Sequence, residues 1–219
     1  LESVEKLCDK AIWIRDGLVA EYGDSKTVCK KYLQYMMEKD EKAALLAEGE
    51  GERSKLEATS EAAEPSELPE RDTGQQEEDQ SNRGQLGSPG SQRWGNGDIT
   101  FYHISLEDKQ GQERRSFITG DPVVIRMRYR KNRPVKSLGF GIGIHRVDGV
   151  HCYGTNTFID QIEVDPEQLP EDGEVLCRID PMSLVEGTYT LDVAAHDKDG
   201  LAYDYITQVL EFKVYSDIK

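Results

Sequence analysis

Hydrophobic and polar residues alternate in several short segments of residues 94–219. In residues 123–130, four apolar side chains fall on one face of a strand and three arginines fall on the other. Residues 189–196 alternate in the same way. Other strands are expected at 99–106, 116–119, 139–147, 150–157, 176–180 and 201–215. Turn residues between these short strands, and the lack of a long helical pattern, predict a mainly β fold: an antiparallel β-sandwich of immunoglobulin-like or jelly-roll type.

Residues 1–37 carry a different pattern, which predicts a small αββα unit. A short helix is expected at 2–9, followed by strands at 11–15 and 18–22. Asp16-Gly17 between the strands is typical of a two-residue turn with positive φ. Asp24-Ser25 is a cap for a second helix. A unit of this size cannot enclose a core, so it is expected to pack on something beyond this chain.

Residues 38–93 form the middle part of the chain, and they contain no Phe, Trp, Tyr, Val, Ile or Cys. Such a segment buries too little apolar surface to offset the entropy of ordering it. We therefore expect a disordered acidic linker, with the preceding helix extending to about Leu46. The predicted division is 1–37, 38–93 and 94–219.

Charge excludes some functions. The 219 residues include 42 acidic and 27 basic ones, a net charge of −15. This acidity argues against nucleic acid as a partner and against docking on anionic lipid. Residues 1–37 are neutral, however, and eight of the negative charges belong to the linker.

No apolar run reaches the ~20 residues of a membrane span. The chain starts without Met or a signal peptide, so we expect it to be part of a longer protein.

A row of glycines marks one face of the expected 139–157 hairpin. If Asp148-Gly149 forms a two-residue turn, Gly141, Gly143 and Gly154 share a face, with His145 and Asn156 at its ends. Glycine weakens a strand, so a row of it indicates that something approaches closely. A shallow platform for a flat polar ligand, such as a sugar ring, is one interpretation. Close packing of a second strand or subunit is the other.

The N-terminal unit resembles a known family. Residues 3–17, followed by Gly23-Asp24, are similar to the last stretch of an ABC transporter ATPase domain, just after its switch histidine. The resemblance implies that the parent protein binds ATP and Mg. This chain has no GxxxxGK[ST] phosphate loop, no signature loop and no Walker B strand. We therefore expect it not to hydrolyse ATP.

Four segments of the C-terminal region resemble the C-terminal domain of Wzt-type ATPases, the ATP-binding subunits of ABC exporters for O-antigen and related bacterial polysaccharides. The matching segments are 140–149, 153–157, 187–197 and 203–205. The resemblance implies a β-sandwich that binds the exported glycan, often at its modified non-reducing end, and that tends to dimerise. It also implies a membrane-spanning partner subunit and a cytoplasmic position on the inner face of the bacterial inner membrane.

Sugar rings stack on aromatic faces, and sugar hydroxyls pair with planar polar side chains. The candidate carbohydrate-binding residues are His145, His151, Tyr153, Asn156, His196 and Tyr203. Each also has a structural interpretation, as a core tyrosine with its hydroxyl at the rim or as a histidine that supports the hairpin. A ligand-free dimerisation module of the same transporter is the alternative function.

Three other features favour structural roles. Arg126, Arg128 and Arg130 could pair with an anionic sugar, but a solvated strand face is favoured. The sequence 197–200 has only part of a calcium loop, so we expect a turn and no metal. Asp192 and Asp204 are weak candidates for a glycosidase pair. The four cysteines lack metal-ligand spacing and are expected to be free thiols.

Overall fold

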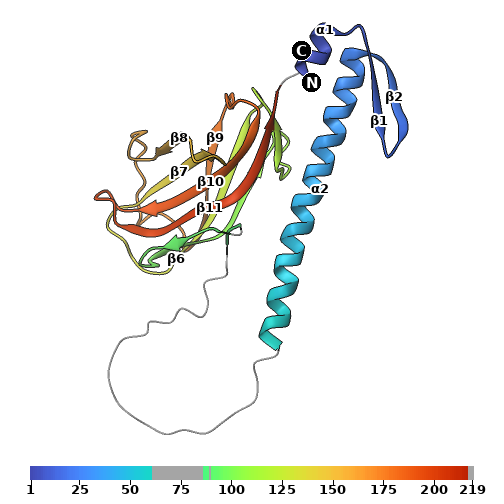
Figure 1. Ribbon diagram of the computed structural model, residues 1–219. Helices are drawn as coiled ribbons and strands as arrows, with labels where there is room; N and C mark the ends of the chain where they lie inside the picture. Colours follow the sequence, from blue (N-terminus) through green and yellow to red (C-terminus); the bar gives the residue numbers. More distant parts are fainter. Residues whose placement is uncertain (61–85, 89, 217–219) are drawn as a thin grey trace.

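The computed structural model describes residues 1–60, 86–88 and 90–216 (Figure 1). The N-terminal unit has the predicted order of elements. They are α1 (Glu2–Leu7), β1 (Lys10–Arg15), β2 (Leu18–Asp24) and α2 (Ser25–Ser60). Asp16 and Gly17 have φ values of 52° and 80°, which confirms the two-residue turn. The Asp24 carboxylate accepts the Thr27 backbone N–H at 3.1 Å, so the predicted helix cap is present.

The hairpin of this unit lies against the first turns of α2. Trp13 packs against Tyr32 and Tyr35, with ring centroids 5.6 Å and 5.0 Å away. Other apolar side chains of the unit remain exposed, among them Ile12, Ile14, Leu18 and Val19. The small αββα unit therefore buries little of its own apolar surface.

Helix α2 is longer than predicted, because it continues past Leu46 to Ser60. The expected extension of the helix to about Leu46 is therefore confirmed, and the expectation of disorder does not hold for residues 47–60. Good helix formers, Glu, Ala, Lys, Leu and Arg, outnumber the two glycines in residues 47–60. Most of the remaining predicted linker, residues 61–85, lies outside the described part of the chain.

The C-terminal part is a two-layer β-sandwich, as predicted. One sheet has the order β3-β11-β10-β7-β8, and β5 also pairs with β11. Its strands are β3 (Arg93–Trp94), β5 (Ser116–Ile118), β7 (Gly139–Arg146), β8 (His151–Asn156), β10 (Gly187–His196) and β11 (Ala202–Tyr215). The other sheet, in the order β4-β6-β9, contains β4 (Ile99–Glu107), β6 (Val123–Lys131) and β9 (Asp172–Ile179). All pairings are antiparallel except that of β5 with β11.

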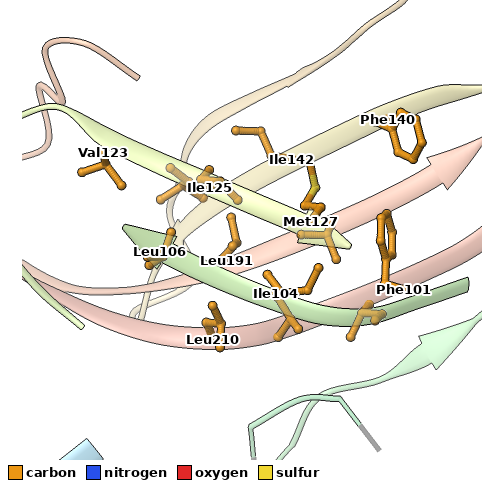
Figure 2. Close-up of a cluster of buried hydrophobic side chains, with 14 of the residues drawn as sticks. Phe101, Ile104, Leu106, Val123, Ile125, Met127, Phe140, Ile142, Leu191 and Leu210 are labelled. Carbon is orange, nitrogen blue, oxygen red and sulfur yellow. The ribbon is translucent and has the colours of Figure 1, made fainter. Parts of the chain in front are cut away.

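The core lies between the two sheets. Every second residue of β6 from Val123 to Tyr129 is buried, which confirms the alternation read from the sequence. Figure 2 shows Val123, Ile125 and Met127 of this strand in one cluster with Leu191 and Leu210 of the facing sheet. Leu86, before the first strand, also packs against the core. The sandwich thus includes residues that precede the predicted domain start at 94.

The β7–β8 hairpin differs from the prediction at its tip. The Arg146 N–H donates to the Val150 carbonyl, and the Gly149 N–H donates to the Arg146 carbonyl, both at 2.8 Å. The loop therefore has three residues, with Gly149 at φ 90°. A three-residue loop with glycine at its left-handed position is a common alternative to the two-residue turn. A bulge follows, so His145 pairs with His151 and not with Cys152 as predicted.

Candidate functional site: a glycine floor on the outer sheet face

The outer face of the larger sheet has a floor of small residues at its centre. We call this the glycine floor: Gly139, Gly141 and Gly143 on β7, Gly154 on β8 and Ala194 on β10. Alternation along β10 directs Leu191, Val193 and Ala195 into the core, so the residues between them face outward. Ala194 pairs with Gly141, and Gly143 pairs with Gly154. The expected register of these glycines is confirmed.

Neighbouring side chains come very close to two of the floor glycines. A Cβ at Gly139 would collide with the ring of Phe158. A Cβ at Gly154 would lie 2.7 Å from His151 Nε2. At Gly143 the nearest atom would be His145 Cε1 at 3.4 Å, which is ordinary contact. A side chain at 139 or 154 would therefore displace the ring of Phe158 or His151, whereas a Cβ at Gly143 would only raise the surface.

Two histidines and a carboxylate stand at one end of the floor. The loop bulge places the His145 and His151 rings 4.7 Å apart. His145 Nδ1 lies 3.5 Å from Asp192 Oδ2. Asp192 is buried, and its other oxygen accepts the Gln208 backbone N–H at 2.8 Å. The carboxylate is held by β11 and lies beside the His145 ring at the floor, where both imidazoles can exchange hydrogen bonds with hydroxyl groups.

An aromatic pair stands at the opposite end of the floor. Trp94 pairs with Tyr205 between β3 and β11, and Tyr205 pairs with Ala194 between β11 and β10. The two rings stack with centroids 4.4 Å apart and planes 9° apart. Trp94 remains 46% exposed. Burial, with a smaller effect of the Asp192 carboxylate, raises the pKa of Tyr205, so its phenol stays protonated at neutral pH.

A third boundary is formed by His196, Phe158 and Asn156. His196 pairs with Gly139, and its ring lies 5.5 Å from that of Phe158. Asn156 pairs with Gly141, and its Oδ1 accepts the Ile159 N–H at 2.9 Å. The Asn156 amide nitrogen is thereby directed by the turn that follows β8. The Phe158–His196 ring pair and the Asn156 amide therefore lie along a third side of the glycine floor.

The structure brings four of the six predicted binding residues to this face and leaves two away from it. Tyr153 pairs with the core residue Ile144, so it lies on the other side of the sheet, and it is 44% exposed. Tyr203 is buried and donates its hydroxyl to the Ser137 carbonyl at 2.8 Å. Burial also raises the pKa of Tyr203. Its contacts are those of a core residue.

The two aspartates considered for catalysis hold the sandwich together. Asp204 is buried and makes two contacts with the Arg93 guanidinium, at 2.8 Å and 2.7 Å. It also accepts the Phe101 backbone N–H at 2.7 Å. These contacts join β11 to β3 and to the facing sheet. Asp192 holds the β11 backbone at Gln208, so both carboxylates are committed to structure.

The arginines of β6 and the 197–200 turn have local partners. Arg126 pairs with Glu107 at 2.5 Å and with Glu174 at 2.6 Å. Arg130 pairs with Asp172 at 2.8 Å. The Asp197 carboxylate accepts two backbone N–H groups of its own turn. Within the described residues, no cluster of three or more histidine, cysteine or acidic side chains is arranged to hold a metal ion.

Sequence reasoning missed Trp94, Tyr205 and Phe158. The first two meet only because the short strand β3 joins the edge of the larger sheet, a pairing that no local pattern reveals. Phe158 is the second residue after the end of β8, and an aromatic residue at that position was a signal available in the sequence. With these residues included, the outer face has a low floor bounded by rings and polar groups.

The model of the family described as the Wzt C-terminal domain matches residues 90–219, more than half of the chain. The chain belongs to the Wzt C-terminal domain family. This confirms the resemblance read from the sequence, and it implies that the matched region is the C-terminal module of an ABC transporter ATPase subunit. The comparison does not extend to residues 1–37, so their likeness to an ATPase domain stays a prediction.

A solved structure supports the Wzt C-terminal domain fold. The crystal structure of the C-terminal domain of Wzt has a TM-score of 0.53 and 18% identity, covering 60% of this chain and 82% of that one. A Niemann-Pick type C2 protein from the Japanese carpenter ant has a TM-score of 0.39 and 12% identity, covering 57% of this chain and 98% of that one. The second likeness is too remote to inform function. None of the curated proteins matches the chain in sequence.

Proposed function

We propose that this chain recognises a bacterial polysaccharide on the glycine floor, as the C-terminal module of an ABC exporter ATPase subunit. The observation that carries the proposal is the stacked Trp94–Tyr205 pair beside a sheet face built of glycine and alanine. An aromatic face packs on the C–H surface of a sugar ring, and a low floor lets the ring approach. His145, His151 and Asn156 supply hydrogen-bonding groups around it.

The dimensions of the face fit an extended ligand. Trp94 and Asn156 lie on the two outermost strands of a five-strand path, four strand spacings apart. At about 4.8 Å per spacing, the face is about 19 Å across. A linear glycan that runs across the strands would contact the aromatic pair and the polar end together. We favour the non-reducing end of the exported chain as the recognised part.

The module would act within a larger assembly. The parent subunit would bind ATP and Mg in its ATPase domain, whereas this chain would have no catalytic role. That domain would contact a membrane-spanning subunit at the inner face of the inner membrane. Among the described residues, no helix is both long and apolar enough to cross a membrane. A tethered module would raise the effective concentration of its glycan near the export channel.

A second candidate uses the same face differently. The glycine floor could be covered by a second copy of the chain, which would make the module a dimerisation unit without a ligand. A flat floor suits close approach of a protein surface as well as a sugar. The two functions differ in what covers Trp94.

The test is a glycan array of bacterial O-polysaccharides, intact and trimmed at the non-reducing end, probed with the 219-residue chain. We expect binding to a small set of glycans and loss of binding on trimming. Sedimentation of the same sample gives its oligomeric state. A dimer that binds none of the arrayed glycans, and in which Trp94 is protected from solvent, would favour the second candidate.

A further inference from the structure

The sandwich also contacts helix α2, through residues that are not part of the glycine floor. The contact involves two acidic residues of the helix and three residues where β5 and β11 run side by side. Figure 1 shows α2 running beside the sandwich from the N-terminal unit. We call these five residues the latch: Asp40 and Glu41 on the helix, and Arg115, Lys213 and Tyr215 on the sandwich.

Asp40 makes the first half of the latch. Its carboxylate accepts the Tyr215 hydroxyl and pairs with Lys213 Nζ at 2.9 Å. The Asp40 side chain is only 17% exposed. Burial opposes its charge, but the bonds from Tyr215 and Lys213 outweigh that effect and lower the pKa of Asp40. The carboxylate is therefore charged and fully engaged at neutral pH.

Glu41 makes the second half. Its carboxylate accepts the backbone N–H of Arg115 at 2.9 Å and 3.2 Å. Arg115 directly precedes β5, and its carbonyl accepts the Lys213 N–H at 2.8 Å. The parallel pairing of β5 with β11 is what brings the three sandwich groups together. A surface of this kind fits an acidic helical turn, because it offers an ammonium, a hydroxyl and a backbone donor.

The same helix is anchored in the N-terminal unit. Val28, Cys29 and Leu33 of α2 are buried, and Val28 and Cys29 lie beside Trp13 of the hairpin. From Ser25 to Asp40 the helix is continuous, a rise of about 23 Å. A bond at Asp40 thus fixes the sandwich relative to the N-terminal unit through a stiff rod.

We propose that the edge formed by β5 and β11 is a docking site for the acidic turn Asp40-Glu41 of α2, and that this latch sets the position of the sandwich relative to the N-terminal unit. The contact is intramolecular, so a few charge-assisted bonds suffice to populate it. Without these bonds, helix α2 would no longer fix the position of the sandwich relative to the N-terminal unit. The inference does not depend on what binds the glycine floor.

The experiment measures the distance between the two parts of the intact chain. Cys8 and Cys152 are exposed and lie in different parts, so both can carry spin labels once Cys29 and Cys177 are replaced by Ala. We expect a single narrow distance distribution in the otherwise unsubstituted chain. The double variant Asp40→Asn with Glu41→Gln should broaden it. A broad distribution before substitution, or a narrow one that persists in the variant, overturns the proposal.

The control removes two charges elsewhere. Glu38→Gln with Glu167→Gln changes one exposed residue on the same helix and one on the sandwich, and should leave the distribution narrow. A second readout is hydrogen exchange at the Arg115 amide, which should accelerate at least tenfold in the latch variant and stay unchanged in the control. Tyr215→Phe, which removes only one hydroxyl, should also broaden the distribution. An Arg115 amide equally protected in both double variants contradicts the latch.

Discussion

The indole of Trp94 lies parallel to the phenol of Tyr205, with 4.4 Å between ring centroids. The pair exists because the two-residue strand β3 adds to the edge of β11. Arg93, the residue before Trp94, forms an ion pair with Asp204, the residue before Tyr205. A buried ion pair thus anchors the strand that carries the exposed ring, so the aromatic end of the glycine floor is rigidly placed.

Trp94→Ala should weaken glycan binding about fivefold, because loss of a stacked ring costs about 1 kcal/mol beyond the area it buries. Trp94→Phe, which keeps an aromatic face, should retain most of the affinity. Isothermal titration with a glycan selected from the array checks both. Tyr102→Ala is the control, since Tyr102 is similarly exposed on β4 of the other sheet. Equal losses at Trp94 and Tyr102 would refute a specific role for the pair.

Gly143→Ala should separate binding from stability. A Cβ at this position meets its neighbours at 3.4 Å or more and the backbone is not left-handed, so the fold accommodates it. Replacing a strand glycine by alanine should raise the free energy of unfolding by about 0.5 kcal/mol. The added methyl raises the floor and should weaken glycan binding. Unchanged affinity would show that the ligand does not approach Gly143.

Gly23→Ala is a matched control for that change. Gly23 also lies in a strand, with no atom within 4 Å of its would-be Cβ and no left-handed backbone. It belongs to the N-terminal hairpin, so its replacement should leave glycan affinity unchanged. Urea unfolding and titration of the two variants together test the assignment of the floor.

Much of the fold could be predicted from the hydrophobic pattern and turn residues of single segments. The alternation in β6 and β10 predicted which side chains enter the core, and Asp16-Gly17 predicted its turn. Each of these features depends on residues within one segment. The predicted register of the floor glycines also holds, because the bulge after His151 offsets the extra loop residue and returns Gly143 to its pairing with Gly154.

The rest depends on contacts between distant segments. The choice between a two-residue and a three-residue loop at Asp148-Gly149 reverses the face on which His151 lies, and both loops accept this sequence. Tyr203 is buried because a bulge in β11 places it against Ser137. Trp94 gained its partner only through the pairing of β3 with β11. Sheet order and bulges are tertiary features that a single strand does not encode.

Asp204→Asn should destabilise the sandwich by about 3–5 kcal/mol, because it leaves the Arg93 guanidinium without its carboxylate in a mostly buried position. The side chains are only 14% and 3% exposed, so solvent cannot replace the lost pair. Thermal unfolding of the chain measures the loss. Asp199→Asn, at an exposed turn position, should have almost no effect. A loss below about 1 kcal/mol would show that the pair is not essential to the sandwich.

Glu107 should make the sandwich sensitive to acid. Hydrogen bonding and charge from Arg126 outweigh desolvation and hold the pKa of Glu107 below its ordinary value of 4.5. A carboxyl with a lowered folded pKa stabilises fully above its unfolded pKa, and the contribution is lost as pH falls through the folded pKa. Glu107→Gln should therefore cost about 2 kcal/mol at pH 7 and much less near pH 2. Urea unfolding at both pH values measures the difference. Glu167→Gln, at an exposed position, should show neither effect, and a Glu107→Gln cost that is equal at the two pH values would rule out the ion pair as its source.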